Sequence, residues 1–129
     1  MNFLIVEDSR NTRNLLKNYI NDIDIGTSRK EFIEADSAET GLIKLKSGRI
    51  DFVLLDWNLS TSMTGLDLLK EVRKDDKFKD LPIIMVTSES DKISVIEALK
   101  HGANDFVVKP IDFKSFKEKV LKVLAQNAG

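Results

Sequence analysis

Residues 52–56 read Phe-Val-Leu-Leu-Asp, four consecutive apolar side chains that end on a carboxylate. An unbroken apolar run of this length is typical of a strand that is covered on both faces, as in a parallel sheet. Four other short runs accompany it, at residues 3–6, 31–35, 83–86 and 106–108. The run at 31–35 is weaker and alternates apolar with charged residues, so we expect this strand at an edge of the sheet.

Segments with helical spacing separate the five predicted strands. Ser9, Ser37 and Asp112 stand where helix N-caps are expected, and Gly102 stands where a helix should stop. The apolar stripes of these segments contain Leu15, Leu16, Tyr19, Ile20 and Ile23; Leu42 and Leu45; Leu66, Leu69 and Val72; Ile93, Ile96 and Leu99; and Phe113, Phe116, Val120, Val123 and Leu124. Strand and helix alternate five times, which is the signature of a right-handed doubly wound α/β fold. Residues 126–129 are predicted to be a frayed end.

The composition limits the function before any motif is considered. The 129 residues include 20 Lys and Arg against 21 Asp and Glu, one histidine and no cysteine. This length suits one domain, and the near-neutral charge gives no attraction to nucleic acid or to an anionic membrane. A chain without cysteine has no disulfide, thiol nucleophile or thiolate metal site. No signal peptide opens the sequence and no run approaches the roughly 18 apolar residues of a membrane span, so a cytoplasmic protein is expected.

The polar residues that follow the predicted strands carry most of the information on function. Glu7 and Asp8 follow the first strand, Asp56 the third, Thr87 the fourth and Lys109 the fifth. In an open α/β sheet these strand ends share one rim, where ligands bind. Three carboxylates at one rim repel each other unless a cation neutralises them, and oxygen ligands of this kind suit Mg²⁺. A hydroxyl and an ammonium beside them predict hydrogen bonds to a phosphoryl group.

These residues resemble those of a known family along essentially the whole chain. Glu7-Asp8, Asp56, Thr87 and Lys109-Pro110, each at its strand end, are similar to the receiver domain of two-component response regulators. Within that family, the stretches 56–58, 65–70, 85–89 and 106–110 look like free-standing chemotaxis receivers of the CheY type. The resemblance implies a flavodoxin-like, five-stranded parallel sheet of strand order 2-1-3-4-5 with five helices. It also implies a phosphorylation-activated signalling switch rather than an enzyme.

The resemblance assigns roles to the acidic residues of the rim. Asp56 would accept a phosphoryl group from the phosphohistidine of a sensor histidine kinase. Mg²⁺ would be bound directly by Asp8, Asp56 and the backbone carbonyl of Asn58, with Glu7 acting mainly through water. Asn58 and Glu89 occupy positions that influence the rate of dephosphorylation in this family.

The resemblance also implies how the signal reaches the surface. Thr87 would hydrogen-bond the phosphoryl group, Lys109 would pair with it, and the Lys109-Pro110 peptide bond would be cis. Phe106 takes the position of the aromatic switch residue. Phosphorylation would draw Thr87 inward and free space for Phe106 to turn in. The surface formed by the fourth helix, the fifth strand and the fifth helix would then change its affinity for a partner.

Two features depart from the family pattern. Gly65 follows Asp56 by nine positions, one more than is usual, and the segment from Leu59 to Thr64 contains no proline. A proline restricts φ and lowers the entropy of a loop, so we expect its absence to loosen the loop and to alter metal affinity or access. Glu7 stands where aspartate is common, and a glutamate there still reaches the water shell of the metal.

The expected organisation is a single receiver domain, residues 1–129, with no output domain. Such a monomer would signal through a noncovalent partner, such as a flagellar motor switch protein or a phosphotransfer protein. Two alternatives stay open: a Mg²⁺-dependent small-molecule phosphohydrolase and a phosphorylation-independent docking module. The hydrolase is disfavoured because Asn58 stands where such enzymes carry a second aspartate, and the docking module because every site position is filled. A nucleotide-binding role is weakest, since no Gly-rich loop follows the first strand.

Overall fold

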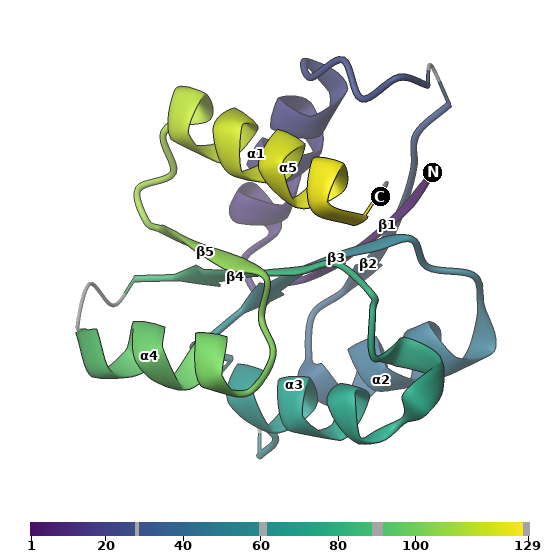
Figure 1. Ribbon diagram of the computed structural model, residues 1–129, viewed down its shortest axis with the longest axis vertical. Helices are drawn as coiled ribbons and strands as arrows, with labels where there is room; N and C mark the ends of the chain where they lie inside the picture. Colours follow the sequence, from purple (N-terminus) through teal and green to yellow (C-terminus); the bar gives the residue numbers. More distant parts are fainter. Residues whose placement is uncertain (28, 60–61, 89–91, 128–129) are drawn as a thin grey trace.

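Five parallel strands form one sheet between two layers of helices (Figure 1). The computed structural model describes residues 1–27, 29–59, 62–88 and 92–127. In chain order the elements are β1 (Asn2–Val6), α1 (Arg10–Asn21), β2 (Glu31–Ala35), α2 (Ala38–Ser47), β3 (Phe52–Asp56), α3 (Gly65–Lys74), the 3₁₀ helix η1 (Asp76–Phe78), β4 (Ile83–Thr87), α4 (Lys92–Lys100), β5 (Asp105–Val108) and α5 (Phe113–Asn127). The strand order is β2-β1-β3-β4-β5, which confirms the predicted doubly wound α/β fold.

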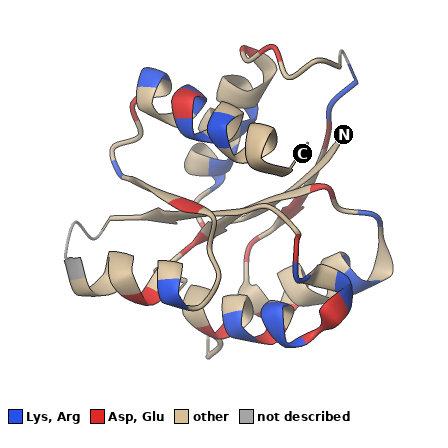
Figure 2. Ribbon diagram, viewed as in Figure 1, with Lys and Arg blue, Asp and Glu red and all other residues tan. Residues whose placement is uncertain are grey.

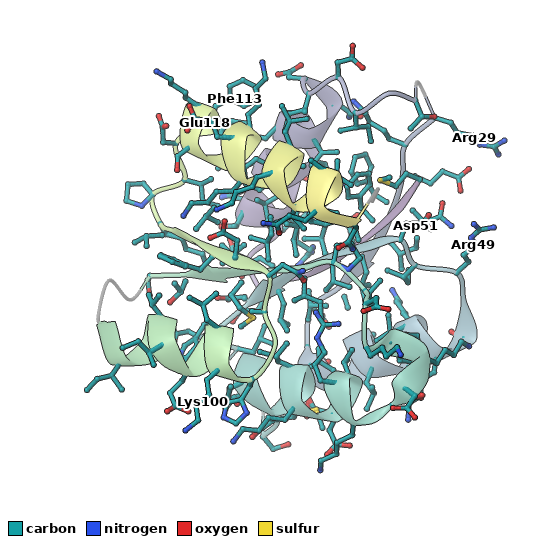
Figure 3. All side chains as sticks on the ribbon, in the orientation of Figure 1. Arg29, Arg49, Asp51, Lys100, Phe113 and Glu118 are labelled. Atoms are coloured by element: carbon teal, nitrogen blue, oxygen red, sulfur yellow. The ribbon has the colours of Figure 1, made fainter. Side chains whose placement is uncertain are left out.

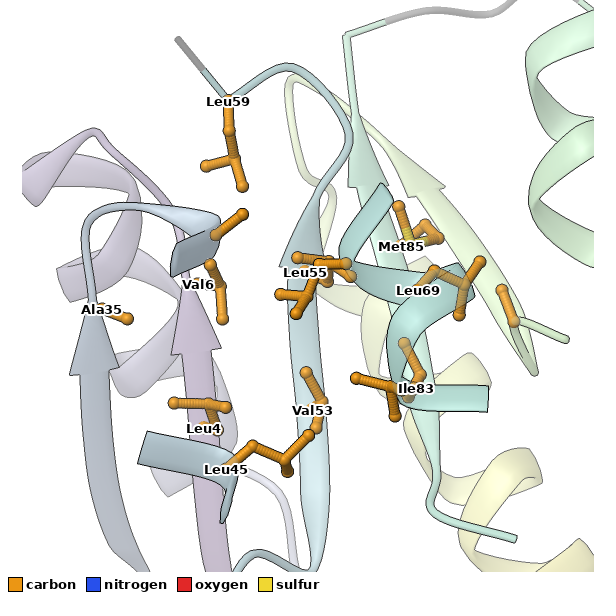
Figure 4. Close-up of a cluster of buried hydrophobic side chains, with 14 of the residues drawn as sticks. Leu4, Val6, Ala35, Leu45, Val53, Leu55, Leu59, Leu69, Ile83 and Met85 are labelled. Atoms are coloured by element: carbon orange, nitrogen blue, oxygen red, sulfur yellow. The ribbon is translucent and has the colours of Figure 1, made fainter. Parts of the chain in front are cut away.

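The apolar runs are buried on both faces of the sheet, because successive side chains of a strand point to opposite sides. Helices α1 and α5 cover one face, and α2, α3 and α4 cover the other (Figure 1). Under α1 and α5 the strands contribute Phe3, Ile5, Phe52, Leu54, Ile84 and Val86. Under α2, α3 and α4 they contribute Leu4, Val6, Val53, Leu55, Ile83 and Met85 (Figure 4). The two clusters explain why these runs are apolar without alternation.

The edge position predicted for residues 31–35 is confirmed. In the described part of the chain β2 pairs with β1 alone, and Ala35 is the one buried residue of β2, whereas all five residues of β3 are buried. The chain runs from β1 outward to β2, returns to β3 on the other side of β1 and then continues to β4 and β5. The winding direction therefore reverses between β1 and β3. A crevice at the carboxyl ends of these two strands is where an open α/β sheet binds ligands.

Most of the predicted helix boundaries are confirmed by their capping contacts. The side chain of Ser9 accepts a hydrogen bond from the Thr12 N–H at 3.3 Å, and Asp112 accepts one from the Ser115 N–H at 2.9 Å. Ser37 caps α2 in the same way. Gly102, two residues after the end of α4, has a φ of 100°, a conformation that glycine adopts without strain.

The apolar stripe read from the sequence of α4 does not face the sheet. Ile93, Ile96 and Leu99 are 69%, 59% and 44% exposed, and Ala98 is the one residue of α4 among those described that is fully buried. Lys100 at the end of α4 also projects away from the sheet (Figure 3). Periodicity identifies residues that share a helix face, but it does not identify which face meets the core. Charged residues and others both occur along α4 (Figure 2), and the exposed large apolar side chains of its outer surface are Ile93, Ile96 and Leu99.

The frayed end predicted for residues 126–129 is wrong for its first half. Gln126 and Asn127 belong to α5, and the Asn127 side-chain amide donates a hydrogen bond to the Asp80 carbonyl at 3.0 Å. This tertiary contact explains why the helix continues past its last apolar residues. Residues 128 and 129 lie outside the described part of the chain. Among the helices of the described residues, none is both long and apolar enough to cross a membrane.

Candidate functional site

The carboxyl ends of β1, β3, β4 and β5 bring the predicted polar residues to one rim of the sheet. Glu7 and Asp8 follow β1, Asp56 and Thr87 end β3 and β4, and Lys109 follows β5. One carboxylate oxygen from each of Glu7, Asp8 and Asp56 lies within 4.8 Å of the others. Glu7, Asp56 and Thr87 are buried, whereas Asp8 is exposed. The strand ends therefore gather one buried hydroxyl, one lysine and three carboxylates.

Asp56 is held in place by the loop that follows it. Its Oδ1 accepts a hydrogen bond from the Asn58 N–H at 3.1 Å, and Lys109 Nζ lies 3.6 Å from the same oxygen. The Trp57 N–H donates to the Val86 carbonyl at 2.9 Å, which extends the pairing of β3 with β4 one residue beyond the strand. A buried carboxylate with a backbone donor and a neighbouring cation is kept in one orientation. Asp56 is thus fixed at the mouth of the crevice.

Gly65 allows α3 to begin directly against Asp56. A Cβ at residue 65 would lie 2.0 Å from the Asp56 carbonyl oxygen, so a larger side chain cannot fit without moving the backbone. The helix starts with a reciprocal cap, in which the Thr64 hydroxyl accepts from the Asp67 N–H and the Asp67 carboxylate accepts from the Thr64 N–H. Sequence reasoning used Gly65 only for spacing and missed this cap. The signal for the cap was the Thr-x-x-Asp pattern at residues 64–67.

Glu7 and Lys109 form an ion pair inside the rim. Lys109 Nζ lies 2.6 Å from Glu7 Oε1, and the other Glu7 oxygen accepts a hydrogen bond from the Ser9 N–H at 3.0 Å. Burial raises the pKa of Glu7 to about 7, although the hydrogen bond from Lys109 acts in the opposite direction. Burial would lower the pKa of Lys109, but its hydrogen bond to Glu7 and the nearby charge of Asp56 outweigh burial and raise it. Lys109 is therefore a cation at neutral pH.

The three carboxylates fit a hard divalent cation such as Mg²⁺. Their oxygens are close enough for one ion to contact all three residues, directly or through water. The exposure of Asp8 leaves an open side for water molecules and a phosphate. Both oxygens of Glu7 already accept hydrogen bonds from the protein, so a water-mediated role suits Glu7 better than a direct one. The backbone carbonyl of Asn58 stays a predicted ligand.

Hydrogen bonds join the loops around the rim. The Lys109 N–H donates to the Thr87 carbonyl at 2.7 Å, which links the ends of β5 and β4. The Lys109-Pro110 peptide bond is cis. The side-chain amide of Asn58 donates to the Ser88 hydroxyl at 3.0 Å and so bridges the loops that follow β3 and β4. Thr87 and Asn58 therefore belong to one connected set of loops.

Phe106, the predicted switch residue, lies in β5 and is partly buried against the cluster under α2, α3 and α4. Lys119 of α5 places its Nζ 4.1 Å from the centroid of the Phe106 ring. Sequence reasoning did not identify Lys119, because it is one of several lysines in this helix. Glu89, predicted to modulate dephosphorylation, lies outside the described residues.

The loop after Asp56 is anchored on both sides of residues 60–61, which lie outside the described part. Leu59 is 6% exposed and joins the cluster shown in Figure 4. On the other side, a carboxylate oxygen of Glu39 in α2 accepts hydrogen bonds from the Ser62 hydroxyl and the Met63 N–H, at 3.1 and 3.4 Å. The loosening expected from the missing proline stays a prediction.

Comparison with known proteins decides the family. The family described as the response regulator receiver domain matches residues 3–121. The chain belongs to this family. Chemotaxis protein CheY of Pseudomonas aeruginosa is 40% identical to this receiver domain over 129 residues, the full length of both chains. Chemotaxis protein CheY1 of Helicobacter pylori is 40% identical over 128 residues, which cover 98% of this chain and 99% of that protein.

Solved structures agree with the sequence relatives. A putative response regulator from Chloroflexus aurantiacus is 28% identical, with a TM-score of 0.85, and the match covers 96% of this receiver domain and 97% of that chain. The chemotaxis response regulator CheY4 of Vibrio cholerae is 27% identical, with a TM-score of 0.82 and coverages of 95% and 97%. The receiver domain is thus of the CheY type, a signalling domain rather than a classical enzyme.

Proposed function

We propose that this receiver domain is a phosphorylation-activated switch of a two-component system, with Asp56 as the phosphoacceptor. The observation that carries the proposal is the setting of Asp56, a buried carboxylate 3.6 Å from the Lys109 ammonium. Its oxygen lies within 4.8 Å of oxygens from Glu7 and Asp8. A carboxylate with this orientation and with positive charge beside it can act as a nucleophile toward phosphorus.

In the proposed reaction, a carboxylate oxygen of Asp56 attacks the phosphorus of a phosphohistidine on a sensor histidine kinase. An O–P bond forms, the N–P bond breaks, and the imidazole nitrogen leaves with the electron pair of that bond. Asp8, Asp56 and the Asn58 backbone carbonyl would hold Mg²⁺, with Glu7 contributing through water. When bound, the ion supplies the positive charge that offsets the phosphoryl oxygens.

Lys109 and Thr87 are the proposed donors to the phosphoryl group. Lys109 Nζ is already 3.6 Å from Asp56, so a phosphoryl group on Asp56 would bring negative charge within reach of the ammonium. The phosphoryl group replaces the single charge of the carboxylate with a larger negative charge and further acceptor oxygens, which also draw in the Thr87 hydroxyl. Asn58, through its bond to Ser88, and Glu89 would modulate how water reaches the acyl phosphate during dephosphorylation.

The proposed output surface consists of α4, β5 and α5. Thr87 moving inward would make room for Phe106 to turn, and Phe106 lies in the strand between these two helices. The exposed apolar side chains of α4 support this assignment, since Ile93 and Ile96 are more than half exposed. Contiguous exposed apolar residues mark protein interaction sites. The partner would therefore be a protein.

The proposed setting is a cytoplasmic chemotaxis pathway. Relatives that match this chain over their full length are named as chemotaxis proteins, which supports that pathway. We propose that residues 1–129 form one receiver domain, which acts as a monomer and has no direct role with nucleic acid or membranes. A flagellar motor switch protein or a phosphotransfer protein would receive the signal.

The test is the intact mass of the protein after incubation with acetyl phosphate and Mg²⁺. Wild type should gain one phosphoryl group, and Asp56→Asn, which keeps the size of the side chain, should gain none. Asp80→Asn, at an exposed aspartate, is the matched control and should behave like wild type. A phosphoryl group on Asp56→Asn, or none on wild type, would refute the proposal. Continuous release of phosphate over many turnovers from a small phosphoester would instead favour the phosphohydrolase.

A further inference from the structure

Lys119 of α5 makes three contacts with the start of β5. Its Nζ lies 4.1 Å from the centroid of the Phe106 ring, and it donates a hydrogen bond to the Phe106 backbone carbonyl. The same Nζ lies 3.8 Å from Oδ1 of Asp105. The Lys119 side chain is only 27% exposed. One partly desolvated ammonium thus ties residues 105 and 106 to α5.

Two of the three contacts hold the backbone of β5 and the Asp105 side chain, and the third acts on the Phe106 ring. The bond to the carbonyl and the pair with Asp105 hold the strand and the neighbouring side chain, whatever the Phe106 ring does. The contact with the ring exists only in the present ring orientation, because cation–π attraction requires the cation over the ring face within about 6 Å. Phe106 has no hydroxyl, so no hydrogen bond can replace this contact. Within the described residues, the ring is positioned by apolar packing and by the Lys119 ammonium.

We infer that Lys119 restrains the switch residue Phe106 and so sets how readily phosphorylation activates the receiver. The inference rests on the proposed function, in which Phe106 turns inward when Asp56 is phosphorylated. Turning the ring gives up the cation–π contact while the other two contacts of Lys119 persist, so the starting orientation is stabilised selectively. Removing the ammonium should shift the balance between the two orientations by about two- to fivefold toward the active one.

The primary experiment titrates the protein with beryllofluoride, an acyl-phosphate mimic, in the presence of Mg²⁺. Trp57 fluorescence reports binding, because Trp57 directly follows Asp56. Lys119→Met keeps most of the apolar stem and removes the charge, and its midpoint should be about two- to fivefold lower than that of wild type. Lys122→Met removes the same charge from an exposed position of the same helix and should match wild type. Equal midpoints for the two methionine variants would overturn the inference.

Two further variants separate the ring contact from the other contacts of Lys119. Lys119→Arg keeps a cation that can lie over the ring, so its midpoint should stay near that of wild type. In a Phe106→Leu background, which lacks the ring, Lys119→Met should no longer change the midpoint. A full effect in that background would assign the change to Asp105 or the carbonyl and would contradict the restraint. If Lys119→Met does not fold, Lys119→Gln serves the same comparison.

A second readout needs neither metal nor mimic. In protein labelled with ¹³C-phenylalanine, the Phe106 ring signals are identified by their absence in Phe106→Leu. In Lys119→Met these signals should move toward the positions that wild type reaches with beryllofluoride, and Lys122→Met should leave them in place. No movement would overturn the restraint alone, provided that wild type responds to beryllofluoride. No response of wild type in either readout would refute the proposed function, and with it the switch that Lys119 restrains.

Discussion

Helices α4 and α5 flank the same strand, but they are attached to the sheet in opposite ways. Both carry apolar residues at helical spacing. In α5 this stripe is buried, with Phe116, Val120 and Val123 at 0% exposure. Tyr19 of α1 also packs against Phe116, with 5.9 Å between the centroids of the two rings. In α4 the stripe faces solvent, and the small side chain of Ala98 provides the buried contact.

This difference separates a structural helix from an adaptable one. The large buried side chains of α5 make it part of the core, so displacing α5 would expose much apolar surface. Displacing α4 would expose less, because its large apolar side chains are already in water. Under the proposed function, a surface that changes when Asp56 is phosphorylated is expected to use the more weakly held helix. The apolar face of α4 would then provide the contact area for a partner.

The largest expected effect on stability comes from a substitution in the buried face of α5. Phe116→Ala should lower the free energy of unfolding by about 3–5 kcal/mol, because it leaves a cavity under α5. Urea unfolding followed by circular dichroism measures this change. Phe113→Ala, at a partly buried residue of the same helix, should cost less. A loss below about 1 kcal/mol for Phe116→Ala would mean that α5 is not anchored as described.

A smaller effect is expected from enlarging the small contact of α4. Ala98→Leu inserts a larger side chain between α4 and the sheet and should cost about 1–3 kcal/mol of unfolding free energy. The same urea experiment provides the measurement, and Leu99→Ala on the exposed face is its control, expected to be close to neutral. If Ala98→Leu has the same free energy of unfolding as wild type, α4 is not closely packed against the sheet at this position.

The affinity for Mg²⁺ should depend on pH, and the group responsible should be Glu7 at the rim of the sheet rather than a residue of α4 or α5. Burial raises the pKa of Glu7 to about 7, so below that pH its carboxyl is protonated and neutral. A divalent cation held near Glu7 favours the ionised carboxylate even when water lies between them, so Mg²⁺ affinity should rise from about pH 6 to about pH 8, by at most about tenfold per pH unit below the pKa. Mg²⁺ titrations followed by Trp57 fluorescence test this. Glu7→Gln should flatten the profile, and an equally steep profile in that variant would exclude Glu7 as its source.

The smallest effect on stability is expected from a substitution on the exposed face of α4. Ile96→Ser should change the free energy of unfolding by less than about 0.5 kcal/mol, because Ile96 is 59% exposed in the folded protein. Urea unfolding beside Phe116→Ala makes the contrast direct. A cost for Ile96→Ser comparable to that of Phe116→Ala would show that the outer face of α4 is buried and would remove it as a partner surface.

Much of the fold could be predicted from short-range patterns. Continuous apolar runs such as residues 52–55 indicate strands covered on both sides, and residues at strand ends share a rim in any parallel sheet. Glu7, Asp8, Asp56, Thr87 and Lys109 could be placed together on this basis. The fit of Gly65 against Asp56 and the position of Lys119 over Phe106 could not, because they depend on contacts between elements. The orientation of α4 was hidden for the same reason, since its spacing is that of a core helix.

The most direct test of the account measures amide hydrogen exchange across the two helices, with and without beryllofluoride and Mg²⁺. We expect exchange in α4 and β5 to change when the mimic occupies Asp56, while the amides around Phe116, Val120 and Val123 in α5 stay protected. Asp56→Asn should show no change under the same conditions. Unchanged exchange in α4 and β5 of wild-type protein that has bound the mimic would contradict the account.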